Sequence, residues 1–352
     1  MHRAPRHLRS LFGHWKLNKV LFQRQYSTAR IIRYLNFVLF KLPFFRKWAT
    51  VFLPSNKDIR LQFTRPKMAD AEYEPGSENA SNILSSLQEK LQNDTETQER
   101  AQELVLNIQD IQASITAAKA GAGTHRRGGD EVLLIAVSKL KPASDILALH
   151  ANGQSHFGEN YVQELWKKHA ILPSTVSWHF IGGLQSSSVS KLARIRNLYA
   201  VHSIDSAKKA VSLNRLRPDN FPLVNVFVQV NTSGEDSKSG VEPDGEELWD
   251  IISTIRKECP RLNLVGLMTI GAIARSQAAK EGEENEDFVT LVKVAEGLEE
   301  RIEKEEGVKV ELKLSMGMSD DFENAISMGA GVVRVGSSIF GARPKKADAC
   351  IL

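Results

Sequence analysis

The sequence has few cysteines and no recognisable spacing of metal ligands. Its 352 residues contain two cysteines, Cys259 and Cys350, with no Cys-x-x-Cys pair, and its nine histidines show no His-x-x-x-His spacing. Two isolated thiols cannot form a disulfide framework, and a structural zinc site needs several clustered ligands. These absences predict a chain without a metal ion, suited to a reducing compartment.

The common nucleotide-binding motifs and a membrane-spanning apolar run are also missing. Neither G-x-G-x-x-G nor G-x-x-x-x-G-K-[ST] occurs, so dinucleotide binding and P-loop binding have no support in the sequence. The hydrophobic segment 31–53 is interrupted by four Arg and Lys residues. It therefore lacks the run of about 20 apolar residues that a transmembrane helix needs, and we expect no membrane span.

Acidic residues are absent from the start of the chain. The first 57 residues contain twelve Lys or Arg, and the first acid is Asp58. The rest holds 34 basic and 42 acidic residues, a net charge of −8, which argues against nucleic acid as a partner. An Arg-rich, acid-free leader is typical of a mitochondrial transit peptide, but Met68 is an alternative start, and a membrane-surface helix is a third interpretation. We expect a cytoplasmic protein, or a mitochondrial one if 1–67 is translated and acts as a transit peptide.

Short apolar runs alternate with helical patterns from residue 132 onward. The expected strands are Val132–Ser138, Ser155–Gly158, Ser177–Gly182, Leu198–Ser203, Leu223–Asn231, Leu262–Ile270, Val310–Met316 and Val332–Gly336. Eight strands with intervening helices over about 210 residues match an α/β protein of the (β/α)8 TIM-barrel type. An open doubly wound sheet is the alternative, although it would usually have a glycine-rich turn after its first strand.

The chain divides into four expected segments. These are a basic leader 1–67, an acidic linker 68–81, a single barrel domain 82–345 and a tail 346–352. The barrel domain begins with a helical pattern from Asn82, and the last expected helix within it is Asp320–Gly329. The polar stretch Ala274–Asp287 is expected to be a loop after the sixth strand.

Lys139 follows the first expected strand directly. That strand is wholly apolar, as buried parallel strands are, and barrels keep their chemistry at the carboxyl ends of their strands. Burial there lowers the pKa of an amine and frees its lone pair to form a Schiff base with a carbonyl. The alternative is a lysine that extends from the strand end into water.

Two later strand ends predict a phosphate site. Ser319 follows the seventh strand as a potential N-cap of the next helix, with Gly317 just before it, and Gly336 and Ser337 follow the eighth strand. Helix N-termini present free backbone N–H groups, and barrels commonly bind phosphate after strands seven and eight. Taken singly, each of these residues could serve only as a cap or a turn.

Arg334 lies inside the apolar run 332–335, so its guanidinium must point along or into the barrel. A buried arginine needs an acceptor, and either a heteroaromatic ring nitrogen or a strand-end carboxylate would supply one. Together with Lys139 and the phosphate site, Arg334 describes a ligand with an aldehyde, a phosphate and a ring nitrogen. That description fits pyridoxal 5'-phosphate.

Other strand ends carry polar residues. They are Glu159 and Asn160 after the second strand, His179 in the third, Ser203 and Asp205 at the fourth, and Gln229 and Asn231 at the fifth. A histidine placed as His179 is placed is more often a hydrogen-bonded structural residue than a base.

Several ordered motifs resemble the pyridoxal phosphate homeostasis proteins, also called the proline synthetase co-transcribed homologue family. They include Ala136-Val-Ser-Lys-Leu-Lys-Pro142, Phe157-Gly-Glu-Asn-Tyr-Val-Gln-Glu164, Trp178-His-Phe-Ile-Gly182, Val230-Asn-Thr-Ser-Gly-Glu-Asp-Ser-Lys-Ser-Gly240, Gly266-Leu-Met-Thr-Ile-Gly271 and Leu314-Ser-Met-Gly-Met-Ser319. The resemblance extends over residues 82–345 and leaves the leader outside. It implies a barrel like the alanine racemase N-terminal domain, without the β domain that the racemases add.

The resemblance also implies a role for each candidate residue. It implies Lys139 as the Schiff-base residue, Asn160 beside the cofactor, Ser319, Gly336 and Ser337 on the phosphate, and Arg334 facing the pyridine nitrogen.

The implied activity is that of a binding protein rather than an enzyme. It would buffer pyridoxal 5'-phosphate or deliver it to apo-enzymes, because a single lysine on one face of the cofactor cannot readily deprotonate and reprotonate on opposite faces. A slow amino-acid racemase is the alternative, and a Schiff-base aldolase on the same barrel is a third class. We expect a monomer whose protein partners are apo-enzymes that use this cofactor.

Overall fold

The computed structural model describes residues 74–121, 127, 131–235, 238–272, 275 and 284–352. The leader 1–67, the first part of the expected linker and most of the expected 274–287 loop lie outside these residues.

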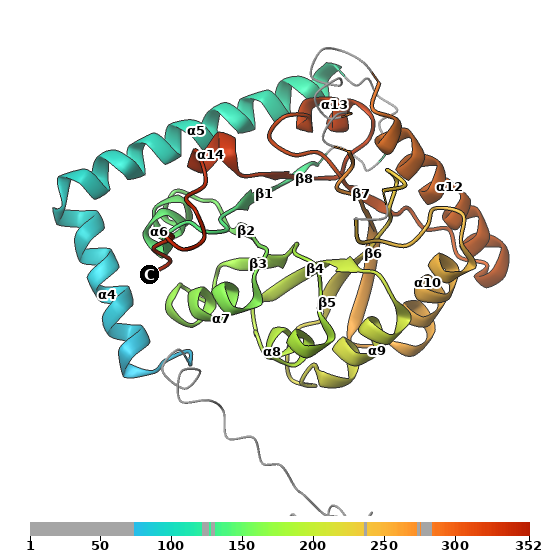
Figure 1. Cartoon of the computed structure of the whole chain (residues 1–352), viewed down its shortest axis with the longest axis horizontal. Coiled ribbons are helices and arrows are strands. Elements are labelled where there is room, and N and C mark those ends of the chain that lie inside the picture. The colour runs from blue at the N-terminus through green and yellow to red at the C-terminus, as the bar shows by residue number, and fades with distance from the viewer. Residues whose placement is uncertain (1–73, 122–126, 128–130, 236–237, 273–274, 276–283) are drawn as a thin grey trace, which may run out of the picture. The chain divides into compact units, whose positions relative to one another are not determined.

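The described residues form a closed barrel of eight parallel strands that follow one another in sequence order (Figure 1). The strands are β1 (Leu133–Val137), β2 (His156–Glu159), β3 (Ser177–Phe180), β4 (Leu198–Ile204), β5 (Val224–Gln229), β6 (Leu262–Met268), β7 (Lys313–Ser315) and β8 (Val332–Val335). The helices are α6 (Ala143–Ala151), α7 (Val162–Ile171), α8 (Val189–Ala193), α9 (Ala207–Leu216), α10 (Glu246–Glu258), α12 (Glu286–Glu306), α13 (Phe322–Ser327) and α14 (Ser337–Phe340), with a 3-10 turn at Ser186–Ser188. Because β1 pairs with β8, the predicted (β/α)8 barrel is confirmed and an open sheet is excluded.

Two apolar layers explain why the strands are so hydrophobic. Along β1, Ile135 and Val137 belong to a cluster inside the barrel, whereas Leu134 and Ala136 belong to the larger cluster shared with the helices. Successive side chains of a strand point to opposite faces, so a barrel strand is buried on both sides. The inner cluster also contains Ala200, Phe227, Met268 and Val332.

Two helices precede the barrel, α4 (Glu78–Asn93) and α5 (Thr95–Gly121). The helical region begins four residues before the expected Asn82, because Ser77 caps α4 by accepting a backbone N–H at 3.2 Å. The end of the expected linker is therefore helix. Asp94 separates the two helices, and its carboxylate accepts a backbone N–H from the first turn of α5 at 2.9 Å.

Helix α5 lies along the barrel beside α6, α13 and α14 (Figure 1). Its buried side chains recur with helical spacing at Leu104, Ile108, Ile111 and Ile115. Arg100 donates to the carbonyl of Phe340 at 2.9 Å, and Asn107 donates to that of Ile339 at 2.9 Å. These two bonds attach α14, and with it the end of β8, to α5.

The largest differences from the predicted elements lie near the end of the chain. Strand β7 has three residues, although the apolar pattern predicted a strand from Val310 to Met316. The short helix α14 was not predicted, because its four residues give no periodicity to recognise. The tail packs back on the barrel, since the carbonyl of Ile351 accepts the N–H of Ala143 at 2.9 Å.

Candidate functional site

Lys139 lies two residues beyond the end of β1, at the carboxyl-terminal mouth of the barrel. Its side chain is half-buried, and within the described residues no hydrogen bond or ion pair engages its amine. Burial lowers the pKa of Lys139 below its ordinary value, and the charge of nearby Arg343 lowers it further. The structure therefore shows an unpartnered amine with the lowered pKa that a Schiff-base lysine needs.

The backbone on either side of Lys139 is held by buried side chains. The Ser138 hydroxyl donates to Glu159 Oε1 at 2.7 Å, and the Leu140 N–H donates to Glu164 Oε1 at 2.7 Å. Leu140 has a φ of 61°, in the left-handed region that a leucine rarely adopts. Two carboxylates thus fix the two neighbours of Lys139 in an unusual local conformation.

A third buried residue, Lys168 of α7, joins these carboxylates. Its ammonium donates to Glu164 Oε1 at 2.6 Å, to Glu159 Oε1 at 2.8 Å and to the Ser138 carbonyl at 2.9 Å. The side chain of Lys168 is 0% exposed. Burial raises the pKa of Glu159 to about 7, although the adjacent Lys168 ammonium opposes this shift. We call Lys168, Glu159 and Glu164 the Lys168 cluster.

Sequence reasoning found Glu159 at a strand end but did not find the Lys168 cluster. The only signal was the spacing of Glu164 and Lys168, which lie one helical turn apart. Such pairs are usually solvent-exposed, so the spacing alone did not indicate a buried site.

Arg334 projects into the barrel from β8 and is 5% exposed. Its guanidinium donates to Ser315 Oγ at 2.8 Å and to the Thr269 carbonyl at 2.8 Å. Within the described residues no carboxylate forms a direct ion pair with it, although the charge of Asp321, which follows β7, acts on the guanidinium from a distance. Burial lowers the pKa of Arg334 to about 10. A buried cation with neutral acceptors and unused N–H donors suits an anionic or ring-nitrogen ligand.

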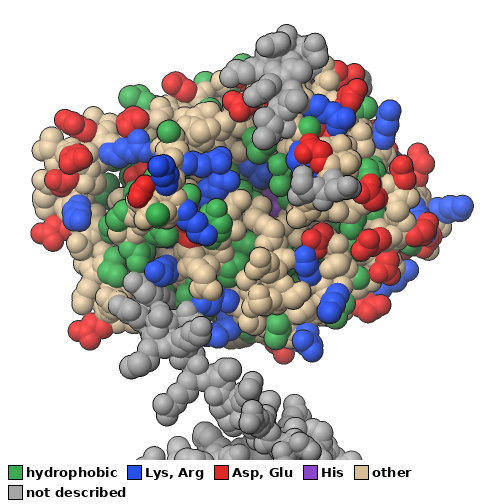
Figure 2. Space-filling model, viewed as in Figure 1, with side chains coloured by type: hydrophobic (Ala, Val, Ile, Leu, Met, Phe, Trp, Pro, Cys, Tyr) green, Lys and Arg blue, Asp and Glu red, His purple; other side chains and the backbone are tan. Residues whose placement is uncertain are grey.

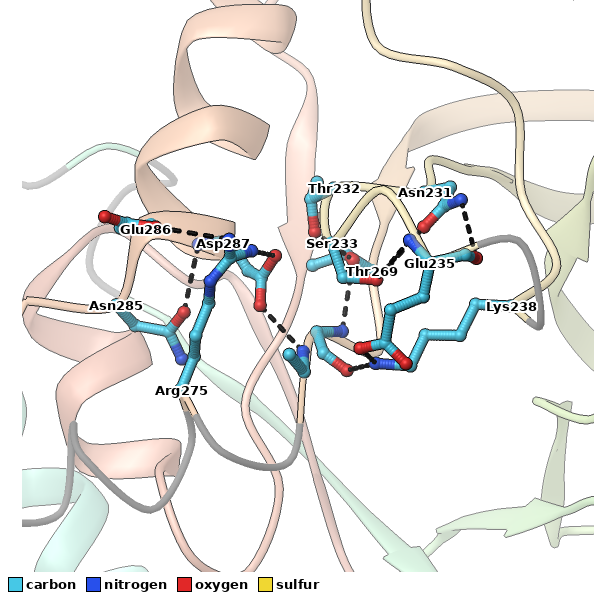
Figure 3. A network of polar contacts seen from close by, with 12 residues as sticks. Asn231, Thr232, Ser233, Glu235, Lys238, Thr269, Arg275, Asn285, Glu286 and Asp287 are labelled. Carbon is cyan, nitrogen blue, oxygen red and sulfur yellow. Dashed lines mark hydrogen bonds and ion pairs between the residues drawn. The ribbon is translucent and has the colours of Figure 1, made fainter.

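The loops after β5 and β6 support the carbonyl that Arg334 uses (Figure 3). Thr269 Oγ1 lies 2.8 Å from Thr232 Oγ1 and accepts the Gly271 N–H at 3.3 Å. Lys238 donates to the Gly271 carbonyl at 2.6 Å, and Asp287 at the start of α12 accepts the next backbone N–H at 2.7 Å. The carbonyl that Arg334 uses is therefore supported by side chains from the loops after β5 and β6 and from the start of α12.

The glycine and serine residues predicted to hold phosphate lie together after β7 and β8. Ser319 Oγ accepts the Gly336 N–H at 3.2 Å, which joins the two strand ends. The expectation that Ser319 caps the next helix is wrong, because α13 begins at Phe322 and Asp321 occupies its N-cap position. Ser319 is used instead to hold the turn at Gly336.

Close backbone approach explains both glycines. Gly317 has a φ of +90°, and a Cβ there would lie 2.6 Å from the Ala325 methyl group. A Cβ at Gly336 would lie 3.3 Å from Val137, so the end of β8 lies directly against the end of β1. Ser337 comes directly after this turn, and its backbone N–H has no hydrogen-bond partner among the described residues. The chain thus brings the predicted phosphate residues to the strand end that precedes Lys139.

Asn160 lies immediately after β2, beside the Lys168 cluster in sequence. Its Oδ1 atom is buried and has no hydrogen-bond partner within the described residues. A buried amide oxygen without a partner costs free energy unless a ligand or water satisfies it. This orphaned atom fits the expectation that Asn160 lies beside a bound cofactor.

Basic side chains gather near β1, α6 and α14 on the face shown in Figure 2. Lys141, two residues beyond Lys139, has hydrogen-bond partners that Lys139 lacks. Its ammonium donates to the carbonyls of Phe340 and Ala342 at 2.8 and 2.7 Å. Of the two neighbouring lysines, only Lys139 has a free amine.

The polar side chains at the other strand ends form hydrogen bonds or ion pairs with nearby loops and helices. Gln229 donates to the Ser239 carbonyl at 2.7 Å, and Ser203 donates to the Gly182 carbonyl at 2.6 Å. Asp205 forms an ion pair with Lys209 at 2.7 Å. Asn231 donates to the Glu235 carbonyl at 3.2 Å.

In the part of the chain that the structure describes, no three His, Cys, Asp or Glu side chains converge on a point where a metal ion could bind. None of the helices there combines the length and the apolar character required to cross a bilayer.

An eight-stranded parallel barrel with a lysine at its carboxyl-terminal mouth is the architecture of a known protein family. The family model of the alanine racemase N-terminal domain matches residues 124–344 of the chain, which is the barrel itself.

Named relatives narrow this class. The pyridoxal phosphate homeostasis protein of Schizosaccharomyces pombe is 45% identical over 216 residues, which cover 61% of this chain and 86% of that protein. The human protein of the same name is 41% identical over 217 residues, covering 60% of this chain and 76% of that one. The chain belongs to the pyridoxal phosphate homeostasis protein family.

Solved structures agree with this assignment. The structure of PipY from Synechococcus elongatus with PLP bound has a TM-score of 0.53 and 28% identity, and the similarity covers 68% of this chain and 100% of PipY. An unknown protein from Bifidobacterium adolescentis has a TM-score of 0.57 and 29% identity, covering 69% of this chain and 96% of that one.

Proposed function

We propose that this protein binds pyridoxal 5'-phosphate through a Schiff base on Lys139 and serves to store the cofactor or deliver it to apo-enzymes. The observation that carries this proposal is the free amine of Lys139 with its lowered pKa, at the same mouth as the turn around Gly336. The names of the relatives and the PLP bound to PipY support the same ligand.

The residues at this mouth match the chemical groups of the cofactor. When bound, pyridoxal 5'-phosphate supplies an aldehyde carbon for an amine, a phosphate and a pyridine ring. Lys139 would hold the first group, and Ser319, Gly336 and the free N–H of Ser337 would hold the second. Arg334 would face the ring nitrogen with N–H donors that its two neutral acceptors leave unused.

Arg334 also favours storage over turnover. An arginine can only donate hydrogen bonds, so a ring nitrogen facing it remains an acceptor without a proton of its own. An unprotonated ring is a weaker electron sink, which disfavours the carbanion chemistry of racemases. The buried carboxylates near Lys139 are bonded to Lys168 and to the backbone, and we infer that their role is to hold the loop.

An absorption titration of the purified protein with pyridoxal 5'-phosphate tests the proposal. The wild-type chain should show the Schiff-base band, and borohydride should fix one cofactor to the peptide that contains Lys139. Lys139→Ala should lose both signals, whereas the matched control Lys141→Met should keep them because the Lys141 ammonium is engaged by two carbonyls. A band that persists in Lys139→Ala would reject this lysine as the attachment site.

The distinction between a carrier and an enzyme needs a second measurement. Proton NMR in D2O should show no α-proton exchange when amino acids are added to the loaded protein. Measurable exchange that requires Lys139 would instead favour the slow racemase. Transfer of the cofactor to an apo-enzyme, faster than release into solution, would support delivery over storage.

A further inference from the structure

Three histidine side chains form a continuous hydrogen-bonded row inside the barrel. His156 Nδ1 lies 2.9 Å from His179 Nε2, and His179 Nδ1 lies 3.0 Å from His202 Nε2. His202 Nδ1 lies 3.0 Å from Ser315 Oγ, the oxygen that accepts from Arg334 at 2.8 Å. The row therefore ends at the guanidinium predicted to face the cofactor ring.

The stagger of the barrel strands produces this row. His179 is the register partner of Gly158, two residues beyond His156, and Ala200, two residues before His202, is the register partner of His179. Each step moves one strand around the barrel and two residues toward the carboxyl ends, as tilted barrel strands require. The row begins with half-buried His156, the first residue of β2, and reaches 0% exposure at His179 and His202.

Arg334 and Ser315 together set the direction of the hydrogen bonds in the row. A guanidinium can only donate, so Ser315 Oγ accepts from it, and His202 Nδ1 is then the acceptor that the described residues offer to the Ser315 hydroxyl hydrogen. His202 then carries its hydrogen on Nε2 and donates to His179 Nδ1. By the same reasoning His179 donates from Nε2 to His156 Nδ1, so all three rings are Nε2–H tautomers.

The surroundings keep the row neutral and fixed. Burial lowers the pKa of His179 and His202 well below the ordinary value, with Arg334 adding to the effect on His202 and the two neighbouring histidines on His179. His202 stacks on Phe227 with ring centroids 4.2 Å apart, which sets its ring plane. Tyr199 contacts the rings of His156 and His179. A neutral row avoids placing a second buried positive charge beside Arg334.

We propose that His202, His179 and His156 are positioning residues that orient the Ser315 hydroxyl and, through it, the Arg334 guanidinium at the ring end of the site. The effect on cofactor affinity rests on the proposed function, but the direction of the row does not. Hydrogen bonds in a chain that all point one way polarise one another, so a change at one end is felt at the other.

Imidazole nitrogen-15 spectra of the ligand-free protein test the direction of the row. The three row histidines should read as Nε2–H tautomers. His150 and His169 are internal controls, because their Nδ1 atoms face backbone carbonyls and should read as Nδ1–H. An Nδ1–H tautomer at any of the three row histidines would overturn the proposal.

Two variants test whether the row acts as a unit. Arg334→Met removes the donor that fixes Ser315, so the tautomer signals of all three row histidines should change while those of His150 and His169 stay. In Ser315→Ala the hydroxyl that links Arg334 to His202 is missing. Adding Arg334→Met to this variant should therefore cause no further change in the tautomer signals of His179 and His156. Unchanged His156 and His179 signals in Arg334→Met alone would overturn the proposal.

Cofactor affinity tests the consequence at the site. His202→Phe keeps the stacking on Phe227 but removes the bond to Ser315, and should weaken binding of pyridoxal 5'-phosphate about 3- to 10-fold, as the loss of one hydrogen bond predicts. Unchanged affinity would overturn the positioning role. If the wild-type protein bound no cofactor, the proposed function would fail, while the tautomer measurement would still decide the direction of the row.

Discussion

Replacement of Lys168 by methionine should destabilise the protein strongly although it changes little volume. The ammonium makes three hydrogen bonds of 2.6 to 2.9 Å inside the core, two of them to buried carboxylates. Methionine keeps the length of the side chain but leaves Glu159 and Glu164 buried beside each other without a cation. Breaking a buried pair in this way costs about 3–5 kcal/mol, so the free energy of unfolding should fall by about that amount.

Urea unfolding followed by circular dichroism at pH 7 measures this change. Lys209→Met is the matched control, because Lys209 also bonds an acid four residues away but is about one-fifth exposed, and should lose less than about 1 kcal/mol. The double variant Glu159→Gln/Lys168→Met replaces one of the two buried carboxyls that have lost their cation, and should recover about 1–3 kcal/mol relative to Lys168→Met. A loss below about 1 kcal/mol in Lys168→Met would refute the inferred cluster.

The same cluster predicts how stability depends on pH. The pKa of Glu159 is raised to about 7 in the folded protein, so between its ordinary value of 4.5 and about 7 the folded chain holds a proton that the unfolded chain has lost. The contribution of Glu159 to stability is therefore full below pH 4.5 and declines as the pH rises to 7, by about 2–3 kcal/mol. Glu159→Gln should flatten this part of the pH profile, and an identical slope in both proteins would contradict the assignment.

Two further predictions concern the packing and the thiols. Gly317→Ala should lower the free energy of unfolding by about 2–4 kcal/mol, because a Cβ at a φ of +90° would also press on a neighbouring methyl group. Gly297 lies at an exposed position inside α12 with open space around it, so Gly297→Ala should instead raise the free energy of unfolding by about 0.5–1 kcal/mol. Equal effects of the two substitutions in chemical denaturation would contradict this explanation. Iodoacetamide at pH 8 should alkylate Cys350 alone in the native protein, because burial raises the pKa of the Cys259 thiol to about 11, and mass spectrometry should find the second label only after denaturation.

The barrel could be predicted because its signals are local and repeated. Each strand is a short apolar run, since its side chains are buried both inside the barrel and under the helices. The carboxyl ends of barrel strands converge at one mouth, so residues at strand ends, such as Lys139 and Gly336, could be predicted to lie near one another. Which of those residues bind the cofactor stays a prediction that the proposed experiments test.

The residues that sequence reasoning missed depend on contacts between distant segments. Lys168 reads as an ordinary helix-surface lysine until the fold brings it under Ser138. Ser319 has the chemistry of an N-cap, but the turn at Gly336, in the next strand end, competes for its hydroxyl. The histidine row likewise requires the register of β2, β3 and β4, which single-sequence patterns do not specify.

The two buried cations near the mouth are stabilised in opposite ways. Lys168 is bonded to two carboxylates, so its charge is more than compensated and it fixes the backbone beneath Lys139. Within the described residues, Arg334 is hydrogen-bonded to a hydroxyl, a carbonyl and, through the hydroxyl, a row of neutral rings, and the nearby Asp321 carboxylate acts on its charge without a direct bond. The cation with N–H donors still unused therefore lies at the Arg334 end and not at the Lys168 cluster, which favours a ligand with an acceptor atom. The two cations thus support the mouth differently, Lys168 through carboxylates that hold the backbone and Arg334 through neutral groups that leave some of its N–H donors unused.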